Sequence, residues 1–244
     1  MARVTIDGRV CEVEPGQHIL AAIGEALPAL CHDPRVAPAG ACRLCLVEVR
    51  GLPRPVPACT TVAYDGMEVA TRTPALEEGR REILEMLAER IPAGGADRVT
   101  AAMREYGVHP RGTADHALVD DSHPYIRVDM TRCIDCFLCE RICHELQGQD
   151  TWHAVERDGR LRLVPDTGAP LGKSSCVGCG ACADACPSGA IEDRVHMPPE
   201  AFTRTTCPYC GVGCELDVGT RDDRIVRIRP TLDAAVNKGH LCVK

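Results

Sequence analysis

The sequence predicts an α+β chain built from several small modules rather than from one large core. Seventeen cysteines stand in groups with short, regular spacing, and metal–thiolate sites allow small modules to fold without a large apolar interior. Short apolar runs alternate with turn pairs such as Asp-Gly, which is typical of hairpins. Aromatic residues make up only 3% of the chain, and Trp152 is the single tryptophan. A large aromatic core is therefore not expected.

The first module spans residues 1–75 and opens with a hairpin. Strand-like runs at 4–6 and 10–13 flank Asp7-Gly8, a pair that favours a type I′ turn. Residues 17–26 follow with apolar side chains at helical spacing. A cysteine-rich loop comes next, and a hairpin, a helix and such a loop are what a β-grasp ferredoxin needs to hold a [2Fe–2S] cluster. A structural zinc site is the alternative. The predicted ligands, spaced C-x10-C-x2-C-x13-C, are Cys31, Cys42, Cys45 and Cys59.

A short helical linker is predicted over residues 76–125. Residues 77–90 place apolar side chains on one stripe and charges opposite, so we expect the charged stripe to be a solvated face. Pro92 and the glycines after it break this helix. Asp97 is expected to cap a second helix that runs to about residue 106.

The third module, residues 126–200, contains the run C-x2-C-x2-C-x3-C twice. This is the spacing of bacterial two-cluster ferredoxins, in which the fourth cysteine of each run binds the other cluster. Zinc does not explain four closely spaced cysteines repeated twice. The first predicted [4Fe–4S] ligand set is Cys133, Cys136, Cys139 and Cys186. The second is Cys176, Cys179, Cys182 and Cys143.

Two features lie within this third module. A hairpin is expected between the two runs, from residues 152–155 to 160–164 around Asp158-Gly159. His144 follows Cys143 where the second run has a proline, which we expect to leave the nearby cluster wetter and to shift its potential.

The last module spans residues 201–244 and is expected to be small and rich in β-strand. Its cysteines are spaced C-x2-C-x3-C-x27-C, which supplies four thiolates for a third [4Fe–4S] cluster. A zinc ribbon is the alternative, because ribbons also place cysteine groups around a hairpin. That hairpin is predicted from residues 215–218 to 224–228. The four predicted ligands are Cys207, Cys210, Cys214 and Cys242.

The words GACRLCLVEV, PAC and DGMEV in the first module carry a family resemblance. They resemble the N-terminal [2Fe–2S] domain of the large iron–sulfur subunit of respiratory NADH:quinone oxidoreductase. Iron-only hydrogenases and NAD-dependent formate dehydrogenases have a related domain. In these relatives the following region holds another cluster, bound by one His and three Cys. Residues 60–132 contain no cysteine, so we expect that cluster to be absent and its place to be taken by the linker. The histidines there are not expected to bind iron: His109, His116 and His123.

The words CPYCGVGC and NKGHLCVK resemble the N-terminal cluster domain of the molybdopterin oxidoreductases, most of all the α subunit of NAD-dependent formate dehydrogenase. The resemblance implies that Lys244 lies between cluster and pterin and binds that cofactor. It implies that electrons leave a molybdenum or tungsten bis-pterin on a partner chain or in a missing C-terminal region. They would then reach a flavin subunit that carries FMN and reduces NAD. No catalytic residue is expected in this chain, because the pterin domains would begin after Lys244.

Two further interpretations stay open. The chain is either a free polyferredoxin-like carrier, or the electron-input subunit of another pterin oxidoreductase or of a hydrogenase or NADH dehydrogenase-type complex. The doubled cysteine run is expected to be missing from respiratory NADH:quinone oxidoreductase, which favours formate dehydrogenase. The formal charge of −7 offers no basic field for nucleic acid. The sequence has no signal-peptide pattern and no apolar run near the length of a membrane span, so a cytoplasmic location is expected.

Overall fold

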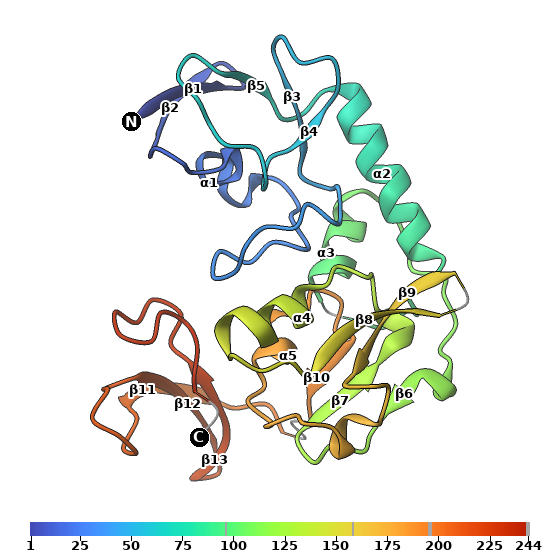
Figure 1. The fold of residues 1–244 in the computed structure, drawn as a ribbon, viewed down its shortest axis with the longest axis vertical. Helices are drawn as coiled ribbons and strands as arrows, with labels where there is room; N and C mark the ends of the chain where they lie inside the picture. The colour runs from blue at the N-terminus through green and yellow to red at the C-terminus, as the bar shows by residue number, and fades with distance from the viewer. Residues whose placement is uncertain (96, 158, 195–196, 243–244) are drawn as a thin grey trace. The chain divides into compact units, whose positions relative to one another are not determined.

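The computed structural model describes residues 1–95, 97–157, 159–194 and 197–242. The chain divides into two compact units. The first comprises residues 1–119, 129–138 and 187–190, and the second comprises residues 120–128, 139–186 and 191–244. Figure 1 shows the elements of both units in chain order.

The first unit begins with the predicted hairpin, which becomes part of a five-stranded sheet. Its turn is formed by Asp7 and Gly8, both with positive φ, as a type I′ turn requires. The sheet order is β2-β1-β5-β3-β4, with β1 and β5 parallel and the other paired strands antiparallel. The strands are β1 (Ala2–Ile6), β2 (Arg9–Val13), β3 (Leu46–Val49), β4 (Val56–Pro57) and β5 (Glu68–Ala70).

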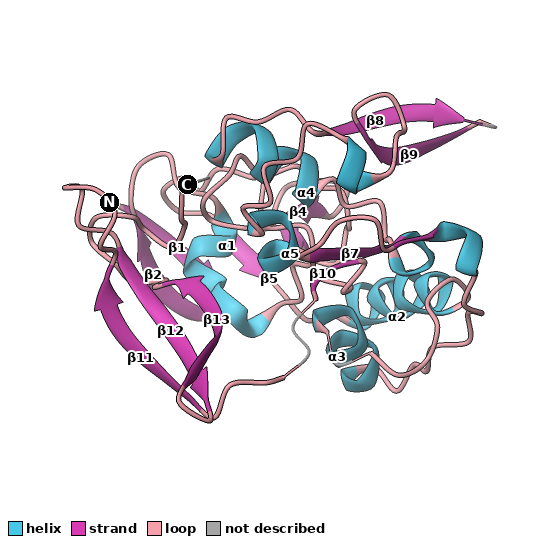
Figure 2. Ribbon diagram, turned by 90° about the horizontal axis from the view of Figure 1, so that it is seen from below, coloured by secondary structure: helices cyan, strands magenta, loops and turns pink. Residues whose placement is uncertain are grey.

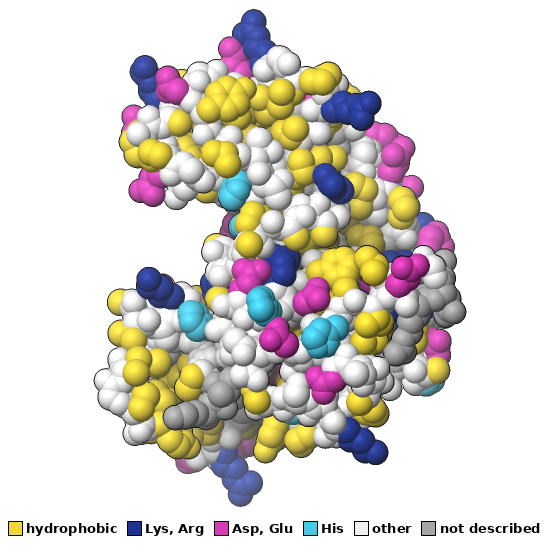
Figure 3. Space-filling model, in the orientation of Figure 1, with side chains coloured by type: hydrophobic (Ala, Val, Ile, Leu, Met, Phe, Trp, Pro, Cys, Tyr) yellow, Lys and Arg dark blue, Asp and Glu magenta, His cyan; other side chains and the backbone are white. Residues whose placement is uncertain are grey.

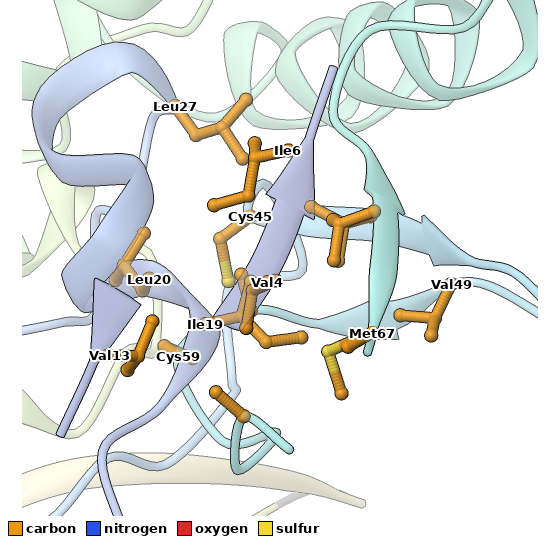
Figure 4. Close-up of a cluster of buried hydrophobic side chains, with 14 residues drawn as sticks. Val4, Ile6, Val13, Ile19, Leu20, Leu27, Cys45, Val49, Cys59 and Met67 are labelled. Atoms are coloured by element: carbon orange, nitrogen blue, oxygen red, sulfur yellow. The ribbon is translucent and has the colours of Figure 1, made fainter. Parts of the chain in front are cut away.

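Helix α1 (Ile19–Ile23) lies against this sheet and continues into a 3₁₀ turn over Gly24–Ala26. The predicted helix was longer at its start, by the two residues before Ile19. Apolar side chains from α1 and the strands form one buried cluster. Figure 4 shows Val4, Ile6 and Ile19 in this cluster together with Cys45 and Cys59. Two predicted cluster ligands therefore lie inside the core of the first module.

The region predicted as a linker forms two helices that are packed into the first unit. Helix α2 (Pro74–Ala88) is capped by Thr73, whose side chain accepts the Leu76 amide at 3.3 Å. Helix α3 (Arg98–Glu105) begins at the predicted cap, Asp97, which forms a capping box with Thr100. A second buried cluster joins these helices to Leu30 and Leu44 of the cysteine-rich loops. The helices thus pack against residues that are adjacent in sequence to the predicted [2Fe–2S] ligands Cys31 and Cys45.

The paired cysteine runs lie beside short elements. Strands β7 (Ile126–Asp129) and β10 (Ile191–Asp193) pair antiparallel, with β6 (Val119–Asp120) beside β7. The helical segments are α4 (Leu138–Arg141), a π-helical stretch over Ile142–Leu146, and α5 (Ala181–Ala185). Strands β8 (Trp152–Arg157) and β9 (Arg160–Pro165) form the predicted hairpin; its Asp158 lies outside the described residues. The remaining 3₁₀ turns cover His116–Leu118, Met130–Arg132 and Leu171–Lys173.

The last module is a three-stranded antiparallel sheet in the order β11-β12-β13. Figure 2 shows its three strands side by side. Strands β12 (Glu215–Arg221) and β13 (Arg224–Pro230) form the predicted hairpin, turning at Asp222 and Asp223 with positive φ. Strand β11 (Ala201–Thr206) was not predicted. All six of its residues are exposed, so it lacks the alternation that marks a half-buried strand.

The described surface shows no concentration of basic charge on the face seen in Figure 3, where Lys and Arg side chains stand singly among acidic and apolar ones. Among the described residues, no helix is both long enough and apolar enough to cross a membrane.

Candidate metal centres

The four predicted [2Fe–2S] ligands are brought together in the first unit. Cys42 and Cys45 lie in the loop before β3, and Cys59 follows β4. The Ala58 amide donates to the Cys45 carbonyl at 3.0 Å, so pairing at the start of β3 places Cys59 beside Cys45. Cys31, Cys45 and Cys59 are at most 1% exposed. The loops therefore bury three of the four predicted ligands, and Cys42 is half-buried.

These thiols lie close together, and the Cys42 amide donates to the sulfur of Cys31 at 3.4 Å. The neighbouring thiols of Cys42 and Cys59 hold the pKa of Cys31 well below its usual range, although burial acts the other way. The same contacts raise the pKa of Cys42 and of Cys59. A hydrogen bond from Cys59 lowers the pKa of Cys45 to about 7. Four sulfurs in one connected, buried set fit the four thiolates that a [2Fe–2S] cluster requires.

Arg80 is a residue of this site that the sequence analysis misplaced. As a charged residue of this helix it was expected to face solvent, yet it is only 1% exposed and lies on the buried face with Leu76 and Leu84. Its guanidinium donates to the carbonyls of Leu44, Leu46 and Thr71 at 2.9, 2.7 and 2.8 Å, and to the Glu77 carboxylate at 2.6 Å. Leu44 and Leu46 stand on either side of Cys45. Arg80 therefore fixes the ligand loop to α2, and the expectation of a wholly solvated stripe was wrong.

The two runs of the paired-cluster module repeat one backbone conformation. Each has positive φ at the residue before its second cysteine and at the residue after it. These residues are Asp135 (53°), Phe137 (56°), Gly178 (71°) and Gly180 (76°). Asp and Phe seldom adopt this conformation. In this conformation the Asp135 amide donates to the Cys133 sulfur at 3.5 Å, and the Gly178 amide donates to the Cys176 sulfur at 3.4 Å. Amide hydrogen bonds to ligand sulfur are among the contacts that set cluster potentials.

Four predicted ligands of one [4Fe–4S] cluster line a single cavity in the second unit. The cavity is small, with a volume of about 20 Å³. Its cysteines are Cys143, Cys176, Cys179 and Cys182, and Cys186 is not among its lining residues. Burial raises the pKa of the last three thiols; a bound metal would offset this, because it deprotonates coordinating thiols. The crossed pairing stays a prediction, and this cavity lining is the observation that favours it.

The other predicted set of this module is divided. Cys133 and Cys136 belong to the first unit, and Cys139 and Cys186 belong to the second, so this set stays a prediction. Within the first unit, Arg90 donates to the Cys133 carbonyl at 3.0 Å and to the Asp135 carboxylate at 2.9 Å. Arg90 thus holds the turn that presents Cys133.

The last set surrounds the start of β12. The Cys207 amide donates to the Cys214 carbonyl at 2.8 Å, closing the loop that holds three of the four cysteines. Asn237 accepts from the Glu215 amide at 2.8 Å and donates to the Glu215 and His240 carbonyls at 3.1 and 3.0 Å. This anchors the segment that carries Cys242 beside Cys214. Cys210 and Cys242 are exposed. Lys244, predicted to contact a pterin, lies outside the described residues.

Within the described part of the chain, no three His, Cys, Asp or Glu side chains form a site for a single metal ion. The cluster assignment therefore depends on the cysteine spacing, on the thiol contacts and on the cysteine-lined cavity.

The linker histidines have structural surroundings. His109 and His116 are exposed. His123 is 6% exposed, and its Nδ1 accepts the amides of Tyr125 and Ile126, both at 3.2 Å. Burial lowers the pKa of His123. These contacts give it a role in shaping the chain before β7.

We predict that His109→Ala and His116→Ala leave the iron content unchanged, because neither histidine has three cysteines with which to hold a cubane. His123→Asn keeps a side-chain acceptor for the two amides, and it should also retain all iron. Iron analysis of the reconstituted variants against the parent chain checks this. Loss of about four iron atoms in any of the three would show that a histidine-ligated cluster exists.

Three family models match the chain in the predicted order. The model of the 2Fe-2S iron-sulfur cluster binding domain matches residues 1–74. That of the 4Fe-4S dicluster domain matches residues 129–199, and that of the molybdopterin oxidoreductase Fe4S4 domain matches residues 200–244.

Curated relatives match over nearly the whole chain. An NADH-quinone oxidoreductase subunit of Rhizobium meliloti is 38% identical over 100% of this chain and 31% of its own length. The alpha subunit of the NADPH-Fe(3+) oxidoreductase of Geobacter sulfurreducens is 33% identical over 100% of this chain and 30% of its own. A Staphylococcus haemolyticus protein provisionally named a formate dehydrogenase is 26% identical over 99% of this chain and 30% of its own. The chain spans less than a third of the length of these relatives.

The expectation that the doubled cysteine run is missing from respiratory NADH:quinone oxidoreductase stays a prediction. The match to the Rhizobium meliloti protein, which is named as an NADH-quinone oxidoreductase subunit, spans all of this chain, including the segment with the paired cysteine runs.

A solved structure also matches. A chain of the NAD+-reducing [NiFe]-hydrogenase in the H2-reduced state has a TM-score of 0.69 and 29% identity, covering 80% of this chain and 88% of its own. Sequence and fold thus agree with the cysteine geometry. The chain is an iron–sulfur electron-transfer module that carries [2Fe–2S], [4Fe–4S] dicluster and molybdopterin oxidoreductase-type Fe4S4 domains in that order, and it is similar to parts of subunits of these oxidoreductases.

Proposed function

We propose that the chain is the electron-transfer portion of an NAD-dependent formate dehydrogenase. The observation that supports this most is the Fe4S4 domain of molybdopterin oxidoreductase type at residues 200–244, at the opposite end of the chain from the [2Fe–2S] domain. One end then suits a molybdenum or tungsten pterin partner, and the other suits a flavin subunit that reduces NAD. A cytoplasmic location belongs to the same proposal.

The clusters, one [2Fe–2S] and three [4Fe–4S], would supply one-electron redox centres, and the protein sets their spacing and potential. Contacts within the second unit hold the last module against the paired-cluster module. Gln147, four residues after Cys143, donates to the Leu241 carbonyl at 2.9 Å. Arg227 on β13 contacts the carboxylates of Asp184 and Asp193 at 3.4 and 2.8 Å. These contacts fix the separation of two cysteine sets, and electron transfer is steeply sensitive to that distance.

The proposal predicts what the 244-residue chain does alone and with a partner. The loaded chain should hold about 14 iron atoms and neither bind molybdenum or tungsten nor oxidise formate. Formate should reduce its clusters only when a pterin-bearing subunit is added, and more slowly when Lys244 is deleted. Metal analysis, formate-dependent dye reduction and electron paramagnetic resonance of the clusters measure these outcomes. Formate turnover by the chain alone, or zinc in place of iron, contradicts the proposal.

A second function is favoured by the relatives at 38% and 33% identity, whose names specify NADH-quinone and NADPH-Fe(3+) oxidoreductase subunits. In that case the chain accepts electrons from a flavin subunit and passes them to an acceptor other than a pterin. Two results together would support this function. NADH or NADPH should reduce the clusters when a flavin subunit is added, and formate should not reduce them when a pterin subunit is added.

A further inference from the structure

Arg132 stands directly before Cys133, the first cysteine of the paired runs. Its charged side chain is only 13% exposed, and a buried guanidinium is costly unless its donors have partners. The hydrogen bonds that Arg132 makes therefore show which segments of the first unit the buried charge holds together.

These hydrogen bonds join the start of the first cysteine run to the helical linker and to the chain that follows the second run. The guanidinium donates to the Asp97 carboxylate at 2.5 Å, to the Ser188 carbonyl at 2.9 Å and to the Pro92 carbonyl at 3.4 Å. Asp97 also caps helix α3, and its side chain is 11% exposed. The cap fixes the Asp97 carboxylate, and its hydrogen bond with Arg132 is strong because both groups are charged. Arg132 is thus held in one orientation toward Ser188.

Two backbone hydrogen bonds hold the same stretch of chain, residues 187–190. The Val99 amide in the first turn of α3 donates to the Pro187 carbonyl at 3.0 Å, and the Asp129 amide donates to the Ala190 carbonyl at 2.7 Å. Residues 187–190 belong to the first unit, as do the linker helices and the start of the first run. This stretch begins directly after the last cysteine of the second run. Its contacts therefore hold the chain that leaves the second run beside the start of the first.

We propose that Arg132, held by Asp97, is a positioning residue for the [4Fe–4S] cluster predicted at Cys133, Cys136, Cys139 and Cys186. It holds the chain after Cys186 so that this thiolate reaches the iron atom that the three cysteines of the first run leave without a protein ligand. Crossed ligation needs such a device, because the fourth ligand comes from the other run. The helical linker, which has no cysteine of its own, then supports a cluster that it does not ligate. The inference rests on the predicted crossed ligation and not on which substrate supplies the electrons.

Substitution of Gly95 displaces the Arg132 side chain without changing a charge. A methyl group on Gly95 would overlap the Arg132 guanidinium and the Asp97 carboxylate, and Gly95 lies outside the left-handed region, so its backbone accepts alanine. Because the Cys186 thiolate stays on the chain, we expect the cluster to assemble in Gly95→Ala but to hold its fourth iron weakly. Ferricyanide should then convert this [4Fe–4S]²⁺ cluster to [3Fe–4S]⁺, with release of one Fe²⁺ and transfer of one electron to ferricyanide. The three-iron share should be about tenfold that of the parent chain, the factor expected for loss of a charged hydrogen bond.

Electron paramagnetic resonance of the oxidised protein measures this share, because the three-iron cluster is paramagnetic and the oxidised four-iron cluster is not. Gly79→Ala is the matched control. It adds the same methyl group to helix α2 with nothing within 4 Å of it, so its signal should stay at the parent level. Adding Cys186→Ala to Gly95→Ala should remove the extra signal, since that double variant is expected to lack a cluster at this site.

Asp97→Asn is the second variant, and it decides the question if Gly95→Ala assembles no cluster at this site. Asparagine still caps α3, but it lacks the charge that holds Arg132, so the three-iron share should again rise. An unchanged share in either variant with full iron overturns the proposal, and so does an extra signal that persists with Cys186→Ala. Loss of the [2Fe–2S] cluster in either variant also overturns it, because Arg132 would then support the whole first unit rather than one ligand set. None of these results depends on the formate and NADH assays, which test the proposed function.

Discussion

Arg80→Met should destabilise the first module by about 3–5 kcal/mol, because each buried polar group left without its partner costs about 1–3 kcal/mol. The substitution retains most of the side-chain volume but removes every donor. Three buried carbonyls, those of Leu44, Leu46 and Thr71, then lose their partner, and unpaired buried polar groups are costly. With a denaturant slope of about 2 kcal/mol per molar, the urea concentration that releases the [2Fe–2S] cluster should fall by roughly 2 M. The visible absorbance of that cluster during a urea titration measures it.

Two companion variants separate the role of Arg80 from a general effect of losing charge on α2. Arg81→Met changes the neighbouring arginine, whose side chain is 46% exposed, and should change stability by less than about 1 kcal/mol. Arg80→Lys keeps the charge, but it replaces a planar fork by a single ammonium group that cannot reach all three carbonyls. It should therefore resemble Arg80→Met more than the parent. Equal urea midpoints for Arg80→Met and Arg81→Met would refute this account of the loop.

The burial of Arg80 shows where reading the sequence fails. The apolar stripe of α2 was recognised correctly, as was the cap at Asp97 for α3, because both depend on residues close in sequence. Arg80 is buried because carbonyls 34 and 36 residues earlier in the chain turn toward it. Helical spacing places Arg80 on the face of Leu84, but the orientation of these carbonyls follows from the ligand loop and cannot be read from periodicity.

The cysteine sites show the opposite situation. Cluster geometry limits the spacing of ligands so strongly that the spacing alone indicated the kind of site, and family models later matched the same three segments. Local turns were also predictable, as Asp7-Gly8 shows. Asp135 and Phe137 have positive φ inside a cysteine run although they are not glycines. This conformation was not predicted, because the one sequence sign of it is that glycines, Gly178 and Gly180, stand at the matching positions of the second run. The position of Trp152 in the cavity lined by Cys182 likewise depends on the packing of a hairpin.

Cys186→Ala should remove the [4Fe–4S] cluster predicted at Cys133, Cys136 and Cys139, although 47 residues separate Cys186 from Cys139 in the chain. The reason is the cavity in the second unit, which gathers Cys143 with Cys176, Cys179 and Cys182 and does not include Cys186 among its lining residues. That cluster has four thiolates without Cys186, so Cys186 is left for the other set. Iron should fall by about four atoms per chain, and Cys11→Ala, a cysteine outside all four sets, should lose none.

The fluorescence of Trp152 decides which cluster was lost. An indole beside an iron–sulfur cluster is quenched by energy transfer, and Trp152 lines the cavity of the Cys182 set. Under crossed ligation, Cys186→Ala loses iron while Trp152 stays quenched, and Cys182→Ala loses a similar amount of iron while Trp152 becomes bright. If each run instead held its own cluster, both variants would empty the site beside Trp152 and both would fluoresce. Equal brightness of the two variants at equal iron loss would therefore rule out the crossed pairing, because the iron count alone is the same under either arrangement.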